Sequence, residues 1–328
     1  MSTSTTSEAV PDPRPVEVRH DLAHVPLAPP SRTSGVLEVF RRRYLLRLLV
    51  RREIQARYAG TAFGLLWSYI NPFTRFLTFY LVFGLLLGRG LGIQNFAIHL
   101  FAGMVLVNYF TESVTAGTRS LLSNRGVITK MAMPREMFPV ASMLVSLWHS
   151  VPQLFILVVA CVATGIWGGG PLWVPDAVGM GAALLGFLII MVFGTAFGLM
   201  FSCINVLFRD FQRIVQTFIN MIPFTAPMMY PYWISYNRFG GGVWHEIYLA
   251  NPVAEAVQLI QRGFWYPTCD GPCAMMPNPN GDGTTIPAPE FADHLYTRGF
   301  VTLAVGLLLL VVGQWVFARL EKSITERL

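Results

Sequence analysis

The chain has 328 residues, of which 53% are hydrophobic and only 13% are charged, about half the charged share of a soluble domain. The charges are also segregated, which leaves several uncharged windows of about twenty residues, the length of a bilayer crossing. These features exclude a soluble globular protein and predict an all-α integral membrane protein.

The first two segments of the chain are polar or basic. Residues 1–34 are rich in Ser, Thr, Pro and charge, and we expect a disordered cytoplasmic tail there. Residues 35–62 are predicted to form a basic interfacial helix, since eight arginines lie between Arg32 and Arg57. An imperfect apolar stripe at helical spacing shares one face of this helix: Leu37, Phe40, Tyr44 and Leu48.

A helix that lies on the membrane surface needs a flexible corner before the chain turns into the bilayer. Gly60 supplies such a corner, because glycine adopts backbone conformations that other residues avoid. The predicted entry gate at this step consists of Arg57, Tyr58, Gly60 and Thr61.

Residues 63–328 are predicted to form a six-span transmembrane domain. The expected spans are about 63–88, 92–118, 137–166, 177–208, 214–235 and 299–318. The fourth span is long enough to be one tilted helix or two shorter ones. In the fifth, Pro223, Pro227 and Pro231 recur every four residues, so one helical face lacks backbone donors. Residues 236–298 are expected to form short re-entrant outer helices and a loop.

The distribution of Lys and Arg predicts the orientation of these spans. With the N-terminus inside, the inner side carries nineteen of these residues and the outer side four. Both termini are therefore predicted to be cytoplasmic.

Four segments resemble, in order, the permease subunits of polysaccharide-export ABC transporters, which export O-antigens, teichoic acids and mycobacterial galactan. They are LVRREIQARYAGTAFGLLWSYINPF from Leu49, MPREMFPVASML from Met133, FRDFQRIVQTFINMIPFTAPMMYP from Phe208 and NPVAEAVQLIQRGF from Asn251. The resemblance implies a homodimer of six-span subunits bound to two ATPase subunits. The polysaccharide would pass between the two halves.

The sequence contains no G-x-x-x-x-G-K-[ST] phosphate-binding loop, so ATP and Mg are expected on the partner ATPase and no cofactor is expected in this chain. The two inner loops are then the natural contacts of the ATPase, although short inner loops are basic in most membrane proteins. The predicted coupling residues are Arg125, Lys130, Arg135, Glu136, Arg209 and Asp210.

Aromatic residues are abundant in the first three spans. Aromatic faces stack on sugar rings, and the alternative is that these residues form interfacial belts. The predicted substrate channel consists of Trp67, Tyr69, Phe73, Arg75, Phe76, Tyr80, Tyr109, Phe110 and Trp148.

Arg75 is the one cation predicted inside a span, and Glu112 is the one acid. Charges at such depth usually have a partner, so we expect the two to pair. The alternative is that Arg75 contacts the pyrophosphate of a polyprenyl-linked glycan. The histidines and carboxylates show no ligand spacing, and neither a metal site nor a catalytic site is expected.

The outer connection carries two further predictions. Asn251, Pro252 and Glu255 form a helix start that we interpret as an outer gate. Cys269 and Cys273 flank a turn-forming Asp-Gly-Pro sequence on the oxidising side and are predicted to form a disulfide, with two free thiols as the alternative.

The favoured function is a permease for lipid-linked polysaccharide, with polyprenyl-pyrophosphate-linked galactan as the first choice of substrate and O-antigen or teichoic acid as alternatives. A membrane-embedded enzyme acting on a polyprenyl-linked glycan would need acidic residues gathered at one membrane face. An ion-coupled carrier would need several intramembrane acids or an inverted repeat. Membrane lipids, but no nucleic acid, are expected as further partners.

Overall fold

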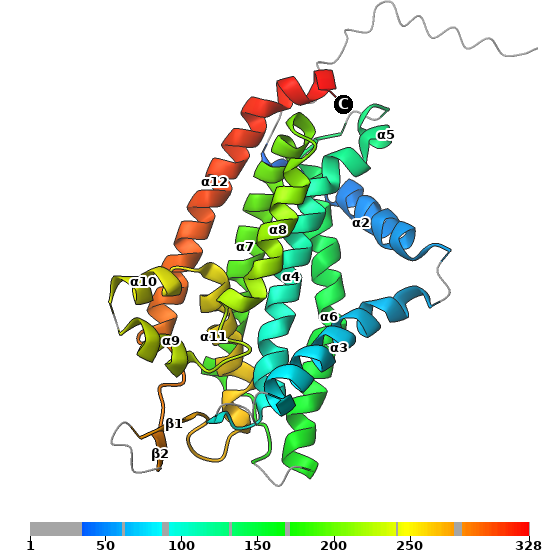
Figure 1. The fold of residues 1–328 in the computed structure, drawn as a ribbon. Coiled ribbons are helices and arrows are strands. Elements are labelled where there is room, and N and C mark those ends of the chain that lie inside the picture. The colour runs from blue at the N-terminus through cyan, green and yellow to red at the C-terminus, as the bar shows by residue number, and fades with distance from the viewer. Residues whose placement is uncertain are drawn as a thin grey trace, which may run out of the picture.

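The protein is a bundle of long helices with shorter helices at its side and at one end (Figure 1). This computed structural model describes residues 35–60, 63–86, 92–130, 133–167, 171–240, 242–278 and 284–327. The predicted tail at 1–34 lies outside these residues. Four of the described helices are long and apolar enough to cross a membrane: α4 (Phe96–Ser123), α6 (Met137–Trp167), α7 (Ala177–Leu207) and α12 (Leu295–Arg327). They make this an all-α, multi-pass membrane protein.

The two ends of the bundle differ in what they carry. The short helix α5 (Arg125–Ile128) and the C-terminus lie at one end, called here the α5 end. A small antiparallel hairpin of β1 (Met275–Pro277) and β2 (Thr285–Pro287) lies at the other, called the hairpin end. The expected positive-inside orientation would place the α5 end in the cytoplasm.

The centre of the bundle is made by α4, α7 and the buried helix α11 (Pro252–Phe264). Small residues let these helices approach closely: a Cβ atom on Gly117 of α4 would lie 2.7 Å from the Cα of Gly198 on α7. Likewise, a Cβ atom on Gly263 of α11 would lie 2.6 Å from the carbonyl oxygen of Gly179. Helix α7 is continuous, so the fourth predicted span is a single helix.

The basic interfacial segment forms two helices, α1 (Val36–Arg41) and α2 (Arg43–Tyr58). On α2, Leu46 and Leu49 are buried in a cluster with α6 residues such as Val140. Tyr44 and Leu48, from the apolar stripe that the sequence suggested, are 73% and 56% exposed. The helix therefore has two apolar faces, one on α6 and one available to lipid.

The first predicted span is helical from Gly64 to Leu86 but is not a single α-helix. It begins with a 3₁₀ turn, η2 (Gly64–Leu66), continues as α3 (Trp67–Phe79), and ends in a π-helix, η3 (Tyr80–Leu86). No residue of α3 is buried, and in Figure 1 α2 and α3 extend to one side of the bundle. Gly60, between them, has a φ of 74°, as expected of a glycine corner, while Thr61 lies outside the described residues.

The fifth predicted span, about 214–235, is wrong in its extent. Helix α8 (Phe211–Thr225) ends soon after Pro223, because the following prolines cannot donate to a helical ladder. The freed carbonyls find buried partners: Gln261 Nε2 donates to the Pro227 oxygen at 3.0 Å, and His99 Nδ1 lies 3.2 Å from the Met228 oxygen. Irregular backbone at membrane depth is tolerated where protein groups satisfy it in this way.

The outer connection contains short helices, as the sequence led us to expect. They are α9 (Tyr232–Phe239), α10 (Val243–Leu249) and a 3₁₀ turn, η5 (Tyr266–Thr268), after α11. Pro231 stands at the start of α9 and Pro252 at the start of α11, where a missing backbone donor is harmless.

Candidate substrate cavity

A cavity of about 710 Å³ lies between α2, α3, α4, α6 and α8, and polar side chains line much of it. Each helix contributes these side chains at helical spacing, so that they share one face. On α4 they form a stripe, and α3, α6 and α8 each add a shorter one. The polar and charged lining residues are Arg57, Tyr58, Ser68, Asn71, Arg75, Asn108, Thr111, Glu112, Thr115, Arg119, His149, Gln153, Gln216 and Asn220.

A chain of charged and aromatic groups joins α2 to the bundle inside this cavity. Glu112 of α4 accepts a hydrogen bond from Arg57 of α2, and its Oε1 lies 2.6 Å from Nδ1 of His149. The other ring nitrogen of His149, Nε2, lies 2.8 Å from the Tyr58 hydroxyl, which also bonds Ser68. In the tautomer whose Nδ1–H donates to Glu112, Nε2 accepts a hydrogen bond from the Tyr58 hydroxyl. These contacts fix the end of the interfacial helix.

The predicted pairing of Arg75 with Glu112 is wrong. Arg75 Nη1 instead donates to Oδ1 of Asn108 at 2.9 Å, and Asn108 Nδ2 donates to Gln153 at 3.2 Å. Arg57 takes the place of Arg75 at Glu112, because the end of α2 reaches the same cavity from outside the span. Both arginines nevertheless face this one cavity.

The lining carries more positive than negative charge. Arg57, Arg75 and Arg119 face a single carboxylate, Glu112, which already accepts from Arg57. A second acid, Glu53 of α2, lies near this region and accepts from Ser142 at 3.3 Å, and burial raises the pKa of its carboxyl. The cavity is therefore suited to a phosphate-bearing group, which arginine binds through several donors at once.

The nine predicted channel residues do not line a single surface. Trp67 and Arg75 line the cavity, whereas Phe76 packs edge-on against Phe101. Tyr109 is buried to 1% exposure near Phe187 of α7, so its predicted place in a channel lining is wrong. The remaining members divide as follows: Tyr80 stacks on Phe96, Phe110 is buried, and Tyr69, Phe73 and Trp148 are exposed. Aromatics close in sequence on a helix point to different sides of it, which separates them.

An apolar groove adjoins the cavity across α8. It has a volume of about 420 Å³ and is lined only by apolar residues of α4, α7 and α8. Ile219 of α8 lines both the groove and the cavity. A polar compartment and an apolar one thus share a wall.

The predicted coupling residues lie at the α5 end but differ in exposure. Arg125, Lys130, Arg209 and Asp210 are exposed. Arg135 is partly buried and ion-paired with Glu321 of α12 at 3.7 Å. Glu136 is fully buried and accepts a hydrogen bond from Gln314, so of its predicted coupling roles only the support of a contact made by other residues is open to it. The turn at Arg209–Asp210 is held by Asn205, which accepts from the Gln212 amide at 3.2 Å.

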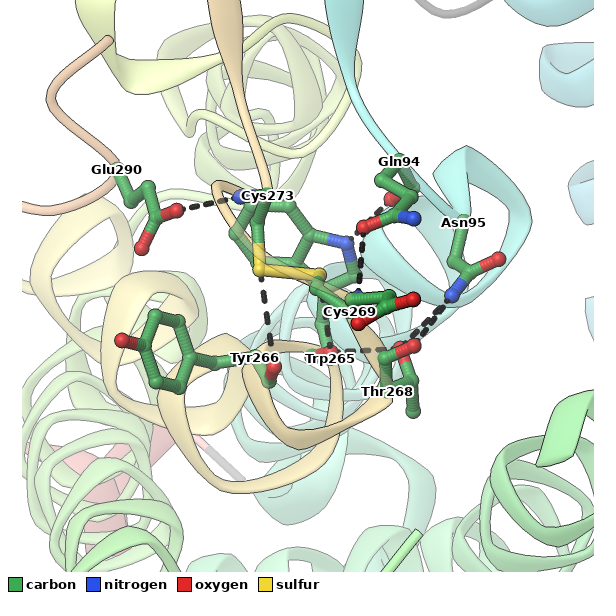
Figure 2. Close-up of a disulfide and its surroundings, with 9 residues drawn as sticks. Gln94, Asn95, Trp265, Tyr266, Thr268, Cys269, Cys273 and Glu290 are labelled. Atoms are coloured by element: carbon green, nitrogen blue, oxygen red, sulfur yellow. Dashed lines mark hydrogen bonds between the residues drawn. A yellow bond between two sulfur atoms is a disulfide. The ribbon is translucent and has the colours of Figure 1, made fainter. Parts of the chain in front are cut away.

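At the hairpin end a disulfide joins Cys269 and Cys273, whose Cα atoms are 5.4 Å apart (Figure 2). The loop it closes is also held from both sides. Gln94 accepts from the Asp270 amide at 3.0 Å, and Glu290 accepts from the Cys273 amide at 2.6 Å. Burial raises the pKa of the Glu290 carboxyl, while this backbone donor acts in the opposite direction.

The predicted outer gate divides into a surface part and a buried part. Asn251 caps α11 by accepting from the Val253 amide at 3.0 Å, and its Nδ2 donates to Thr225 at the end of α8. Glu255 is fully buried, and neither of its carboxyl oxygens has a hydrogen-bond partner among the described residues.

The polar stripe on α4 is the signal that the sequence analysis missed. Asn108, Thr111, Glu112, Thr115 and Arg119 follow the i, i+3, i+4, i+7 and i+11 spacing of one helical face.

Among the described residues, no three His, Cys, Asp or Glu side chains gather as a metal-binding group would require.

Comparison with known proteins shows which proteins this chain resembles. Residues 44–265 match the family described as ABC-2 type transporter. The chain is 32% identical over 200 residues to the O-antigen export system permease protein RfbA of Myxococcus xanthus, covering 60% of this chain and 72% of the relative. A protein of the same name from Klebsiella pneumoniae is 24% identical over 268 residues, covering 80% and 89%.

Proposed function

Because this chain belongs to the ABC-2 type transporter family, we propose that it is the permease subunit of an ATP-driven exporter of polysaccharide. The relatives that it resembles are named as O-antigen export permeases. The observation that carries the proposal within this chain is the arginine-lined cavity between the interfacial helix and the spans. Such a cavity is suited to receive the charged group of a substrate that arrives from the membrane surface.

The substrate proposed here is a lipid-linked polysaccharide. The cavity supplies cations for a pyrophosphate, and the adjoining groove supplies an apolar surface for a polyprenyl chain, with Ile219 in the wall between them. A lipid-linked glycan is an amphiphile of this kind. Polyprenyl-pyrophosphate-linked galactan is our first choice, and O-antigen or teichoic acid are the alternatives.

The proposed assembly is a homodimer of this chain with two ATPase subunits in the plasma membrane. Helix α3 has no buried residue, and α8 exposes Phe218, Met221 and Phe224 beside the cavity. These faces are available to a second copy, and the polysaccharide would pass between the copies. Both termini and the α5 end are proposed to be cytoplasmic, which agrees with the excess of Lys and Arg there.

The ATPase is proposed to dock at the α5 end. Arg125 and Lys130 beside α5, and Arg209 and Asp210 after α7, present exposed charges in an otherwise apolar chain. Asp210→Lys should uncouple ATP hydrolysis from export and leave insertion intact. Normal export by this variant would place the docking surface elsewhere.

The test is reconstitution in proteoliposomes with the ATPase that copurifies in mild detergent. The chain alone should hydrolyse no ATP, and lipid-linked glycan should stimulate ATP hydrolysis by the complex. Arg75→Gln should raise the glycolipid concentration for half-maximal stimulation about tenfold, since hydrogen bonds to charged groups are worth about 1.5–3 kcal/mol.

The matched control is Arg238→Gln, an exposed arginine of α9 that does not line the cavity. It should leave stimulation unchanged. ATP turnover by the chain alone, or chemical alteration of the glycolipid, would contradict the permease and favour a membrane enzyme.

A further inference from the structure

Helix α12 is held near both of its ends by polar contacts with other parts of the chain. Its 33 residues make it about 50 Å long, enough to reach from the hairpin end to the α5 end (Figure 1). The elements that it contacts at the two ends are far apart in the bundle.

At the hairpin end the contact is a two-pronged ion pair. Arg298 of α12 donates from Nη1 and Nη2 to the two carboxylate oxygens of Glu246 on α10, both at 2.9 Å. This hydrogen bonding lowers the pKa of Glu246. The planar guanidinium fixes the direction of α10 as well as its position, since two parallel bonds resist rotation.

At the α5 end α12 holds the segment that leads into α6. Arg135 Nη1 lies 3.2 Å from the Glu321 carbonyl oxygen and 3.7 Å from its carboxylate. One residue further, Glu136 is buried against α12 by its bond to Gln314. Phe317, between them on α12, is fully buried in the same cluster as Met137 and Phe138.

Between its ends α12 lies directly against α7. A Cβ atom on Gly313 would lie 3.0 Å from the Ala196 carbonyl oxygen, and one on Gly306 would lie 2.7 Å from the Phe193 ring. Helices in such close contact through glycines move together more readily than they slide, because sliding would drive side chains into backbone. The pair of α7 and α12 therefore acts as one rigid body.

We propose that α12, docked on α7, transmits movement of the segment around Arg135 and Glu136 to helix α10 at the opposite end of α12. The proposal rests on the proposed function, since the movement originates when the ATPase binds ATP at the α5 end. Glu321 and Arg298 are the positioning residues through which α12 grips the two ends. By this route the ATP-binding step reaches the outer helices along elements that do not line the cavity.

The test measures hydrogen exchange of residues 243–249 in the reconstituted complex, with and without a non-hydrolysable ATP analogue. In the native complex the analogue should change exchange in this helix. The double variant Arg135→Gln/Arg298→Gln, which removes the arginine from each end contact, should lose that response, and the polysaccharide exported per ATP hydrolysed should fall about fivefold, while ATP binding persists. Exchanging the outer charges, Arg298→Glu with Glu246→Arg, in the native background should retain the response, which a folding defect would not allow.

Arg238→Gln, an equivalent change on the neighbouring α9, is the control and should leave the response intact. The inference is overturned if the double variant still transmits the nucleotide response to α10. It is also overturned if a native complex that exports normally shows no response there. A native complex that neither exports nor hydrolyses ATP would instead contradict the proposed function, and the inference would fall with it.

Discussion

The bundle centre and the arm formed by α2 and α3 are held in place by different forces. In the centre, α4 is largely buried, and glycines bring α4, α7 and α11 into backbone contact. In the arm, no residue of α3 is buried, Leu46 and Leu49 of α2 pack on α6, and polar bonds around Glu112 hold the end of α2. Close packing gives a frame whose helices move as a unit, whereas the polar bonds at the end of α2 give an attachment that can be released. A permease needs both properties, and here they lie in separate regions.

The largest effect is expected from a single methyl group in the frame. Gly117→Ala would place a Cβ atom 2.7 Å from the Gly198 backbone, and we expect a loss of about 3 kcal/mol, at the upper end for overpacking. Thermal unfolding in detergent measures it. Gly181→Ala is the matched control, since nothing lies within 4 Å of the added methyl group on α7. Equal melting temperatures for the two variants would contradict the close packing of α4 on α7.

The next effect concerns the attachment of the arm. Glu112→Ala leaves Arg57 and His149 without their shared acceptor, and we expect a loss of about 2 kcal/mol, less than for a fully buried pair because Arg57 is 35% exposed. Hydrogen exchange should rise in residues 43–58 and stay unchanged in α7. The stability losses of Arg57→Ala and Glu112→Ala should be less than additive when the two changes are combined. Those of Arg75→Ala and Glu112→Ala should be close to additive. The reverse pattern would support the pairing of Arg75 with Glu112 that the sequence suggested.

A smaller effect is expected at the hairpin end. Cys269→Ser/Cys273→Ser opens a very short loop, so the loss should be about 1 kcal/mol, at the low end for disulfides. Gln94 and Glu290 still hold the loop backbone. Thiol labelling of intact cells, before and after reduction, checks the bridge directly. Labelling of both cysteines without prior reduction would refute it.

The smallest effect is expected inside the frame itself. Glu255 is buried without a hydrogen-bond partner among the described residues, so Glu255→Gln should change stability by less than about 0.5 kcal/mol or stabilise the protein. Gln258→Glu, one turn further on the same helix, is the contrast. Its side chain accepts from the Ala292 amide at 2.8 Å and is fully buried, so a carboxylate there should be destabilising. Thermal unfolding of the two variants distinguishes them, and a marked loss of stability from Glu255→Gln would show that the carboxyl has a partner outside the described residues.

The family and the helical class could be predicted from the sequence because they depend on local patterns. Uncharged runs, the ordered motifs and the Asn251–Pro252 helix start are all contained in short segments. The partner of Glu112 could not be predicted in this way. Arg57 is 55 residues away and reaches the cavity only because the chain turns at Gly60, whereas Arg75 merely shared the expected membrane depth. The end of α8 was misjudged for a related reason, since spacing alone does not show whether a proline bends a helix or ends it.

The early end of α8 has a consequence for the path out of the cavity. A helix of 15 residues is about 22 Å long, whereas the hydrocarbon layer is about 30 Å thick. The exposed Ile214, Phe218 and Phe224 therefore cover only part of that thickness, and the irregular residues 226–231 cover the remainder. Along the side of the protein where the cavity lies, the helical wall is shorter than the hydrocarbon layer, so a sugar chain that leaves the cavity beside α8 has less helix to pass.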